Sequence, residues 1–308
     1  MRVCFFGIGS IGKRHLNNLS VICKKNNMPL IVDVFRNTTK KLDDDVKEMI
    51  ECEIFTEDDL KNDYDIIFIT NPTGMHYQTL KSNLNRAKNF FIEKPVFEKN
   101  YDIGEIELKN DGIYYVACPL RYSNVILSIK DLIKNGEKPF SVRAISSSYL
   151  PDWRPNVDYR KIYSAIKELG GGVSIDLIHE LDYLTYLFGM PDEIIRCIGK
   201  YSNLEISSDD LAIYICKYRD KLIEVHLDYF GRIQKREVEL YCGDKVIVGD
   251  ILKNKLIIGD KEFCFEENPN DKYIREMEYF IGCIENGVKT ENEIQNAQSV
   301  LKLSREGY

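Results

Sequence analysis

The stretch Arg2-Val-Cys-Phe-Phe-Gly-Ile-Gly-Ser-Ile-Gly12 decides the fold of this protein. Its first half predicts a short buried strand and the residues from Ile11 onward predict a helix, so the glycines lie in the loop between them. In that context Gly7 permits a tight turn, Gly9 lets the backbone approach a pyrophosphate, and Gly12 lets helix and strand pack closely. The helix start adds unpaired N–H groups that attract phosphate. We therefore assign dinucleotide binding to Gly7, Ile8, Gly9, Ser10, Ile11 and Gly12.

The first 118 residues alternate short apolar runs with helical stretches, which is typical of βαβ units and a doubly wound parallel sheet. The run Ile66–Thr70 lacks polar alternation, as expected for a central strand that helices cover on both faces. We predict a Rossmann domain, with α/β architecture, over residues 1–120. Its predicted strands are Arg2–Phe6, Leu30–Phe35, Ile66–Thr70, Phe90–Glu93 and Ile113–Cys118.

From about residue 140 the pattern predicts a larger, mostly antiparallel sheet with helices, which is an α+β domain over residues 121–308. Its predicted strands are Ser141–Tyr149, Glu193–Tyr201, Leu211–Tyr218, Leu222–Phe230, Glu237–Cys242 and Leu256–Ile258. Its predicted helices are Gly172–Phe188, Lys272–Asn286 and Glu291–Arg305. The strand Leu211–Tyr218 is apolar or aromatic on both faces, so its second face packs on another subunit or is buried within one subunit.

Composition excludes several classes of function. The chain has 308 residues and a formal net charge of −7, which argues against nucleic-acid binding. No apolar run approaches the ~18 residues that a membrane span needs, so we expect no membrane partner. The nine cysteines are scattered singly, without a C-x-x-C pair or neighbouring histidines. We expect reduced, mostly buried thiols, a cytoplasmic protein and no bound metal.

The end of the second predicted strand indicates which dinucleotide binds. An acidic residue there binds the ribose 2′-hydroxyl of NAD, whereas an arginine accommodates the 2′-phosphate of NADP. The terminal position is Arg36, followed by Asn37, and Asp33 lies a turn too early. These residues predict NAD(P) as the cofactor, with NADP slightly favoured. The alternative for Arg36 is a solvated charge at a strand end.

Two further loops follow predicted strands at the carboxyl edge of the sheet, where ligands of open α/β sheets bind. Asn71-Pro72 follows one strand and Glu93-Lys94-Pro95 follows the next, so we assign Asn71, Pro72, Glu93 and Lys94 to the cofactor site. His76 begins the next helix and is a further candidate for the cofactor, although a polar residue at a helix start is a simpler interpretation.

The second half contains a glycine triplet, Gly170-Gly-Gly172, that leads into a predicted helix. On this helix the apolar residues share one broad face, and Asp176, His179, Glu180 and Tyr183 fall on the opposite one. Such a helix buries one side and presents a carboxylate and an imidazole to a site. The alternative for His179 is a surface histidine in a salt link with a neighbouring aspartate.

An aromatic and basic cluster precedes the glycine triplet, and an Arg-Tyr pair follows the last Rossmann strand. Side chains of these types hold a sugar ring and a phosphate or carboxylate. The alternative is a structural loop that a tryptophan and two prolines hold in place. The candidate substrate residues are Arg121, Tyr122, Trp153, Arg154, Tyr159, Arg160 and Tyr163.

Taken in order, the glycine loop, Asn71-Pro72, Glu93-Lys94-Pro95 and the glycine triplet with Asp176 and His179 resemble the glucose–fructose oxidoreductase / inositol dehydrogenase (Gfo/Idh/MocA) family. The resemblance runs along nearly the whole chain. It implies an open-faced sheet in the second domain that forms homodimers or homotetramers. It also implies hydride transfer between NAD(P) and a hydroxyl or carbonyl carbon of a sugar, amino sugar or sugar nucleotide. The glycine-triplet region resembles a branch among bacterial amino-sugar and surface-glycan enzymes.

The resemblance assigns catalysis to Lys94, Asp176 and His179. A base must take the hydroxyl proton as the hydride leaves carbon, and a histidine with a pKa near neutrality suits that role. Lys94 would hydrogen-bond the same oxygen, and Asp176 would orient the substrate or raise the basicity of the histidine. Many relatives place the histidine four residues after the aspartate, whereas this chain has three, and both spacings keep the pair on one helical face.

Two other functions fit the same motifs. One is a regulator that senses the cofactor without catalysis, because a fold does not fix a function. The other is an enzyme that holds NAD tightly and carries out a net reaction that is not redox. Retention of all three candidate catalytic residues argues against the regulator.

Overall fold

The computed structural model describes residues 1–305 and divides into two compact units. The first unit contains Met1–Ala117 and Tyr273–Ser299, and the second contains Cys118–Lys272 and the chain from Val300 onward. The sequence placed all residues after 120 in one second domain, whereas residues 273–299 belong to the first unit. The reason is packing: Phe280 lies against the rings of Phe68, Phe91 and Tyr115, with centroid distances of 6.4, 5.3 and 5.6 Å.

The first unit contains a six-stranded, fully parallel sheet in the order β3-β2-β1-β4-β5-β6, which confirms the predicted Rossmann topology. Its strands are β1 (Arg2–Phe6), β2 (Ile31–Phe35), β3 (Cys52–Ile54), β4 (Tyr64–Ile69), β5 (Ala87–Ile92) and β6 (Ile113–Val116). Its helices are α1 (Ser10–Lys25), α2 (Asp44–Lys47), α3 (His76–Asn83) and most of α7 (Asp271–Asn286). The short strand β3 was not predicted from the sequence.

The central strands of this sheet are buried on both faces because helices cover them. In β4 the residues Ile66–Ile69 are fully buried, as their unbroken apolar pattern predicts. Phe5 stacks on Phe68 at 4.3 Å between ring centroids. His15 of α1 contacts Phe91 of β5 and Tyr273 of α7, so these two helices cover the same face.

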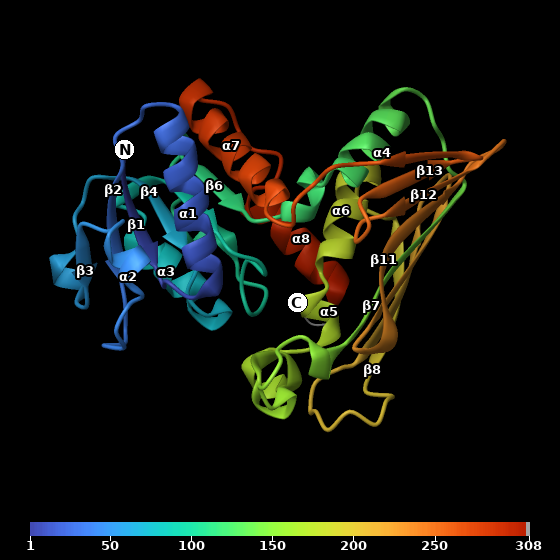
Figure 1. The fold of residues 1–308 in the computed structure, drawn as a ribbon, viewed down its shortest axis with the longest axis horizontal. Helices are drawn as coiled ribbons and strands as arrows, with labels where there is room; N and C mark the ends of the chain where they lie inside the picture. Colours follow the sequence, from blue (N-terminus) through green and yellow to red (C-terminus); the bar gives the residue numbers. More distant parts are fainter. Residues whose placement is uncertain (306–308) are drawn as a thin grey trace. The chain divides into compact units, whose positions relative to one another are not determined.

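The second unit contains an eight-stranded sheet in the order β14-β13-β12-β11-β7-β10-β9-β8 (Figure 1). Every neighbouring pair is antiparallel except β7 with β10, which confirms the mostly antiparallel prediction. Its strands are β7 (Ser141–Tyr149), β8 (Glu193–Gly199), β9 (Leu211–Lys217), β10 (Leu222–Asp228), β11 (Phe230–Tyr241), β12 (Val246–Asp250), β13 (Lys255–Ile258) and β14 (Lys261–Cys264). Its helices are α4 (Asn124–Lys134), α5 (Val173–Asp176), α6 (His179–Phe188) and the last turn of α8 (Ile294–Ser304).

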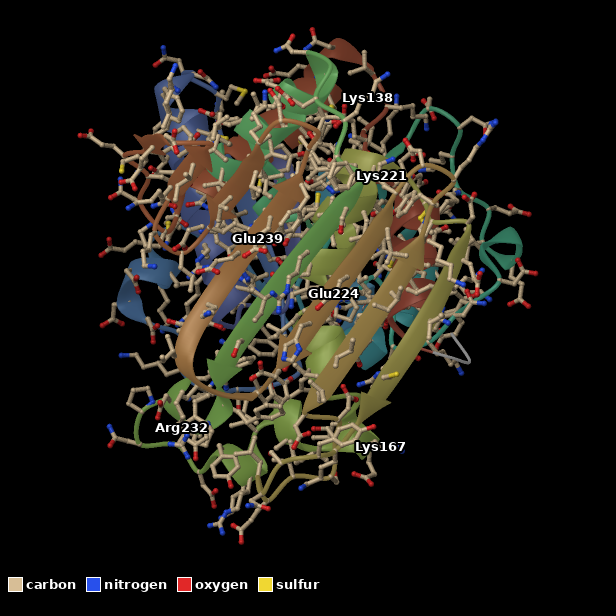
Figure 2. The ribbon with its side chains drawn as sticks, turned by 90° about the vertical axis from the view of Figure 1, so that its right-hand side faces the viewer. Lys138, Lys167, Lys221, Glu224, Arg232 and Glu239 are labelled. Carbon is tan, nitrogen blue, oxygen red and sulfur yellow. The ribbon has the colours of Figure 1, made fainter. Side chains whose placement is uncertain are left out.

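The two faces of this sheet differ. One face packs under α4 and α6: a Cβ on Gly249 of β12 would meet Val125 and Ile129 of α4, and Tyr214 of β9 is fully buried. No helix of residues 1–305 covers the other face, and Glu224 of β10 and Glu239 of β11 project from it (Figure 2). The residues of β9 on the open face are only half-buried. The alternative that this strand is buried on both faces within one subunit is therefore wrong.

Candidate functional site

A cavity of about 910 Å³ lies in the first unit. It is within the range of about 300–1,000 Å³ that small-molecule sites occupy. The glycine loop, the end of β2, the loop after β4 and the middle and end of α3 line it. Of the predicted cofactor residues, Gly7, Ile8, Gly9, Ser10, Arg36, Asn37, Asn71 and Pro72 line the cavity, whereas its lining does not include Ile11, Gly12, His76, Glu93 and Lys94.

The three glycines of the loop have different surroundings. Gly7 has a φ of +91°, and a Cβ there would lie 2.8 Å from the Cα of Asn71. A Cβ on Gly12 would lie 2.7 Å from the carbonyl oxygen of Gly7. A Cβ on Gly9 would meet nothing within 4 Å. Gly7 and Gly12 therefore satisfy packing inside the protein, and Gly9 leaves space for a ligand to approach the backbone.

The N-terminus of α1 carries no side-chain cap. Gly9 occupies the N-cap position without a side-chain hydrogen bond, and the first turn contains no acidic residue. The first N–H groups of a helix need external acceptors, and the positive end of the helix dipole favours an anion there. These donors fit the pyrophosphate of a dinucleotide.

The end of β2 differs from the sequence prediction in one respect. Arg36 is only 7% exposed, and its guanidinium lies 2.5 Å from the Glu53 carboxylate and also donates to the carbonyl of Lys40. The solvated-charge alternative for Arg36 is therefore wrong, and its charge is already paired. Asp33 is fully buried and accepts a hydrogen bond of 3.0 Å from the Tyr64 hydroxyl, so it is structural.

His76 connects the two loops at the carboxyl edge of the sheet. Its Nε2 lies 2.9 Å from the carbonyl oxygen of Asn71, and its Nδ1 lies 3.1 Å from that of Pro95. The ring is 1% exposed, and burial lowers the pKa of its imidazole. His76 therefore holds together the two loops on which Asn71 and Lys94 lie.

A second histidine fixes the Glu93-Lys94 segment. His15 Nε2 lies 2.5 Å from Glu93 Oε1, and Glu93 Oε2 accepts a hydrogen bond of 3.1 Å from the Lys94 N–H. His15 is fully buried and Glu93 is 9% exposed. Burial alone would raise the pKa of Glu93, but the hydrogen bond and charge of His15, with those of Lys94, bring this pKa below its ordinary value. Sequence reasoning missed this contact, because it joins residues that are 78 positions apart.

The predicted helix Gly172–Phe188 is two helices in the second unit, because α5 ends at Asp176 and α6 begins at His179. His179 is half-buried at the first position of α6. Glu180 and Tyr183 are fully buried, so the predicted polar face is wrong for both. Glu180 Oε1 lies 2.7 Å from Nε of Arg236 on β11, which shows that this side of α6 packs on the sheet.

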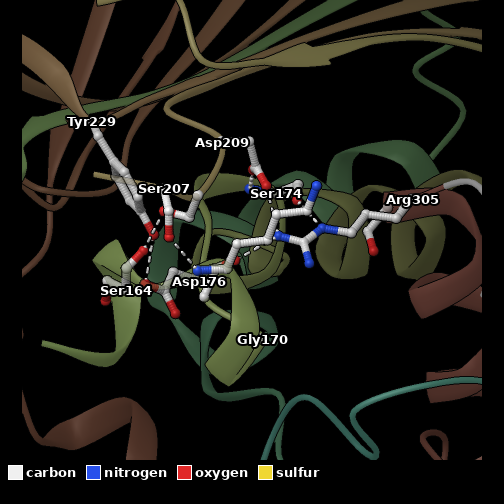
Figure 3. A network of polar contacts seen from close by, with 12 residues as sticks. Ser164, Gly170, Ser174, Asp176, Ser207, Asp209, Tyr229 and Arg305 are labelled. Atoms are coloured by element: carbon white, nitrogen blue, oxygen red, sulfur yellow. Dashed lines mark hydrogen bonds and ion pairs between the residues drawn. The ribbon is translucent and has the colours of Figure 1, made fainter. Parts of the chain in front are cut away.

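A clamp of Asp209 and Arg305 holds the segment that leads into α5 (Figure 3). The Asp209 carboxylate accepts from the Ser174 N–H at 2.9 Å and from the Arg305 guanidinium at 2.7 Å. Arg305 also donates to the Ser174 hydroxyl at 2.7 Å and to the Gly171 carbonyl at 2.9 Å. Gly172 has a φ of +134°, and a Cβ there would collide with both clamp residues. The glycines therefore permit a tightly bonded backbone just before Asp176.

Tyr229 fixes the side chain of Asp176. Its hydroxyl donates to Asp176 Oδ2 at 2.6 Å, and its ring makes an edge contact with Trp153 at 5.2 Å between centroids (Figure 3). Tyr229 is fully buried. Burial, followed by the charge of Asp176, raises the pKa of Tyr229 well above its ordinary value, so the hydroxyl keeps its proton. Sequence reasoning missed Tyr229, because only the fold brings it to Asp176.

The predicted substrate cluster divides into bonded and exposed members. Arg121 is 4% exposed and forms a two-pronged pair with Asp182, at 2.8 and 2.6 Å. Trp153 donates to the Ser148 hydroxyl at 3.0 Å, and Arg160 pairs with Asp158 at 2.8 Å. Tyr159 accepts from the Glu205 N–H, Tyr163 donates to the Gly170 carbonyl, Tyr122 is half-buried and Arg154 is exposed. For Arg121 the structural alternative holds, because both ends of its guanidinium fork engage one carboxylate.

Within residues 1–305 no group of three or more His, Cys, Asp or Glu side chains is arranged to hold a metal ion. The helices of this described part include none with the length and apolar character to cross a membrane.

The parallel sheet in 3-2-1-4-5-6 order, with its glycine loop at the cavity, defines a dinucleotide-binding Rossmann protein. Residues 1–116 match an oxidoreductase family with an NAD-binding Rossmann fold. Residues 130–232 match the C-terminal alpha/beta domain of the same oxidoreductase family. The chain therefore belongs to the Gfo/Idh/MocA oxidoreductase family, which confirms the resemblance seen in the sequence.

Two curated proteins are similar in sequence to part of this chain. It is 31% identical over 193 residues to the uncharacterised oxidoreductase YrbE of Bacillus subtilis, which is 59% of this chain and 52% of YrbE. It is 23% identical over 167 residues to 2,7-anhydro-N-acetylneuraminate hydratase of Mediterraneibacter gnavus, which is 51% of this chain and 43% of the hydratase. The chain thus spans about half the length of the curated relatives it matches.

Solved structures share the fold over the whole chain. A levoglucosan dehydrogenase in complex with NADH superposes with a TM-score of 0.85 at 14% identity, covering 98% of this chain and 94% of that one. UDP-N-acetylglucosamine 3-dehydrogenase from Acidithiobacillus ferrooxidans superposes with a TM-score of 0.75 at 18% identity, covering 100% and 96%. At these identities the likeness concerns the fold.

Proposed function

We propose that this protein is an NAD(P)-dependent oxidoreductase that transfers a hydride between the nicotinamide and a hydroxyl or carbonyl carbon of a sugar, amino sugar or sugar nucleotide. The observation that carries the proposal is the cavity at Gly9 and the uncapped start of α1, in a chain of this oxidoreductase family. Two structural neighbours are named as dehydrogenases of levoglucosan and of UDP-N-acetylglucosamine, which supports a substrate of the sugar class. A role in surface-glycan synthesis is part of the proposal.

The chain supplies the groups that the reaction needs. A bound dinucleotide would accept or give the hydride. His179 takes the proton of the reacting hydroxyl, and Lys94 stabilises the negative charge that develops on that oxygen. Asp176 orients the substrate, since Tyr229 holds its carboxylate in one position.

Two substitutions test these roles. His179→Ala and Lys94→Met should each lower turnover at least about 100-fold, because each removes a group that acts on the reacting oxygen. Both variants should bind NADH and NADPH like the parent protein in a fluorescence titration. His226→Ala is the matched control, because His226 lies on β10 and pairs with Asp228. Full activity in His179→Ala or Lys94→Met would contradict the assignment.

The fate of the cofactor separates the proposal from its two alternatives. Purified protein is titrated with NADH and NADPH, and free and UDP-linked amino sugars are then added while the nicotinamide absorbance is followed. A net change in absorbance with exchangeable cofactor supports a dehydrogenase or reductase. Tightly held cofactor with product but no net change would indicate a non-redox reaction, and binding without any product would indicate a sensor.

NADP is the slightly favoured dinucleotide because three cations line the cavity near the end of β2, together with the carboxylates of Asp43 and Glu57. These cations are Arg36, Lys40 and Lys41. Glu53 pairs with Arg36, and Asp44 lies 3.3 Å from the Lys41 ammonium. We assign the 2′-phosphate to Lys40, which is exposed.

We also propose a homodimer or homotetramer that forms through the open face of the second unit's sheet. By register this face carries Ile195, Ile215 and Val248 beside the Arg143–Glu224 ion pair, which is 3.5 Å long. Apolar side chains interleaved with charges of both signs suit a self-complementary contact between two copies. A cytoplasmic location is proposed as well, because none of the nine cysteines forms a disulfide within residues 1–305, which is typical of a reducing compartment.

A further inference from the structure

A second cavity, of about 490 Å³, lies in the second unit at the edge of the sheet. The edge strand β8 forms one wall with Arg196 and Ile198. These two residues pair in register with Tyr214 and Ala212 of β9, which are fully buried, so the cavity lies on the helix-covered side of the sheet. It shares no lining residue with the dinucleotide cavity of the first unit.

The cavity has a strong excess of positive charge in an otherwise acidic chain. Among residues 1–305 its lining contains the four cations Lys167, Arg196, Lys200 and Arg305 and one carboxylate, that of Asp209. That carboxylate is matched by Arg305, at 2.7 Å, so the other three charges are in excess. The whole chain has a net charge of −7, which makes this local excess of cations a specific feature.

Part of this charge is held in position. Arg196 donates from Nε to the Leu303 carbonyl at 2.9 Å and from one terminal nitrogen to the Lys302 carbonyl at 3.0 Å, at the end of α8. Lys200 donates to the Ser202 carbonyl at 2.8 Å. The Lys167 ammonium makes no hydrogen bond or ion pair with any of residues 1–305. The fixed guanidinium of Arg196 and the ammonium of Lys167 could together bind a phosphate, because phosphate oxygens accept hydrogen bonds from several donors at once.

The two clamp residues, Asp209 and Arg305, also line this cavity. Arg305 lines the cavity and bonds Gly171 and Ser174, and Asp209 lines it and bonds the Ser174 N–H. An anion that attracts Arg305 competes with these bonds. Such an anion would act on the backbone that sets the position of Asp176.

We propose that this cavity binds the phosphate or diphosphate group of a small metabolite and that its occupancy alters catalysis through Arg305 and the Asp176 segment. The binding half stands without the proposed function, whereas the catalytic half rests on it. Two sources share this chemistry, because the phosphate belongs either to a separate effector or to a phosphorylated substrate.

Binding is tested with inorganic pyrophosphate by isothermal titration calorimetry on the full-length protein. Saturating NADH or NADPH is present so that the glycine loop is filled. We expect one site per chain with a Kd below about 1 mM, weakening as ionic strength rises from about 0.1 M to about 1 M. Lys167→Gln and Lys200→Gln should each raise the Kd at least about fivefold, because each removes a full charge. Both side chains are exposed, so the variants keep the fold.

Lys138→Gln is the matched control, because Lys138 is an exposed lysine near the opposite end of the same unit (Figure 2). It should leave the Kd unchanged. Absence of pyrophosphate binding, or equal binding by parent, Lys167→Gln and Lys200→Gln proteins, overturns the site.

The kinetic arm uses whichever sugar substrate the absorbance assay identifies. Competitive inhibition by pyrophosphate against that substrate indicates that the cavity holds the substrate's own phosphate. A change in kcat that more substrate does not reverse indicates an effector. Binding without any change in kcat or KM overturns the catalytic half while leaving the binding half in place.

Discussion

His15 of α1 and Glu93, which directly follows β5, are joined by a buried contact of 2.5 Å between Nε2 and Oε1. The same carboxylate accepts the N–H of Lys94 through its other oxygen. A single buried group thereby joins α1, which we propose to bind the pyrophosphate, to the residue proposed to act on the substrate oxygen. Both contacts lie within the first unit.

Replacing Glu93 with glutamine should destabilise the protein by about 2 kcal/mol at neutral pH, because buried hydrogen bonds to a charged group contribute about 1.5–3 kcal/mol. The pKa of Glu93 lies below its ordinary value of 4.5, so its charge adds stability that is complete above that value. This contribution is lost as the pH falls through the lowered pKa. Urea unfolding at pH 7 and in steps below pH 4.5 measures it. Glu98→Gln in the same loop is the control, and a Glu93→Gln deficit that persists unchanged at pH 2 would contradict the prediction.

Gly9→Ala and Gly12→Ala should separate binding from packing. Gly9→Ala should retain the parent melting temperature but weaken NADH and NADPH binding at least about tenfold, because the methyl group occupies the ligand's approach to the backbone. Gly12→Ala should lower the melting temperature, because its Cβ would lie 2.7 Å from the Gly7 carbonyl oxygen. Thermal scans and fluorescence titrations measure both. Normal cofactor affinity in a folded Gly9→Ala protein would remove the loop from the binding site.

Lys40→Ser should lower the affinity for NADPH about tenfold and leave that for NADH within about twofold, since it removes the cation assigned to the 2′-phosphate. Arg36→Gln should instead lower stability, because Arg36 is 7% exposed and bonds Glu53 and the backbone. Parallel titrations with the two cofactors give the affinity ratio. If Lys40→Ser affects both cofactors equally, another residue discriminates between them.

Tyr229→Phe removes one hydroxyl and keeps the ring that contacts Trp153. We expect kcat to fall about tenfold while cofactor affinity is unchanged, because Asp176 loses the bond that orients it. The pKa of Tyr229 is raised, so the hydroxyl stays protonated and the loss should be the same at all pH values from 6 to about 10. Steady-state kinetics across this range test the prediction. A loss that disappears at one end of the range would indicate a different role.

Ile195→Glu should convert the proposed oligomer to a monomer, because Ile195 is 45% exposed on the open face of the sheet. Val21→Glu is the matched control, since Val21 is 56% exposed on α1 of the first unit. Light scattering after size exclusion gives the mass of each variant. If the parent protein is a monomer, or if Ile195→Glu keeps the parent's mass, the proposed interface is wrong.

The sequence predicted the elements whose pattern is local and strong. The run at Ile66–Ile69 has no polar residue, so it had to be a strand covered on both faces. The glycine spacing predicted which backbone positions need close approach, and the surroundings of Gly7 and Gly12 agree. The strands β3, β12 and β14 were not predicted, because segments of three to five residues carry little periodicity.

Burial of polar groups could not be predicted from local pattern. Glu180 and Tyr183 fall on the polar side of the helix, yet both are fully buried, and a distant arginine, Arg236, pairs with the glutamate. Arg121 finds its carboxylate 61 residues away, at Asp182. Each ion pair depends on which distant segments the fold brings together. The hydrophobic periodicity of one segment carries no information about that.

By itself the sequence determined the doubly wound parallel sheet of the first unit, the glycine loop and the family, because these depend on hydrophobic period and on motifs of residues close together in the chain. Only the tertiary structure decided that α7 completes the first unit, that Arg36 is already paired, and that Tyr229 and Arg305 fix the Asp176 segment. The physical reason is that burial and hydrogen bonding join residues far apart in sequence. Their energies depend on the folded arrangement rather than on any local run of residues.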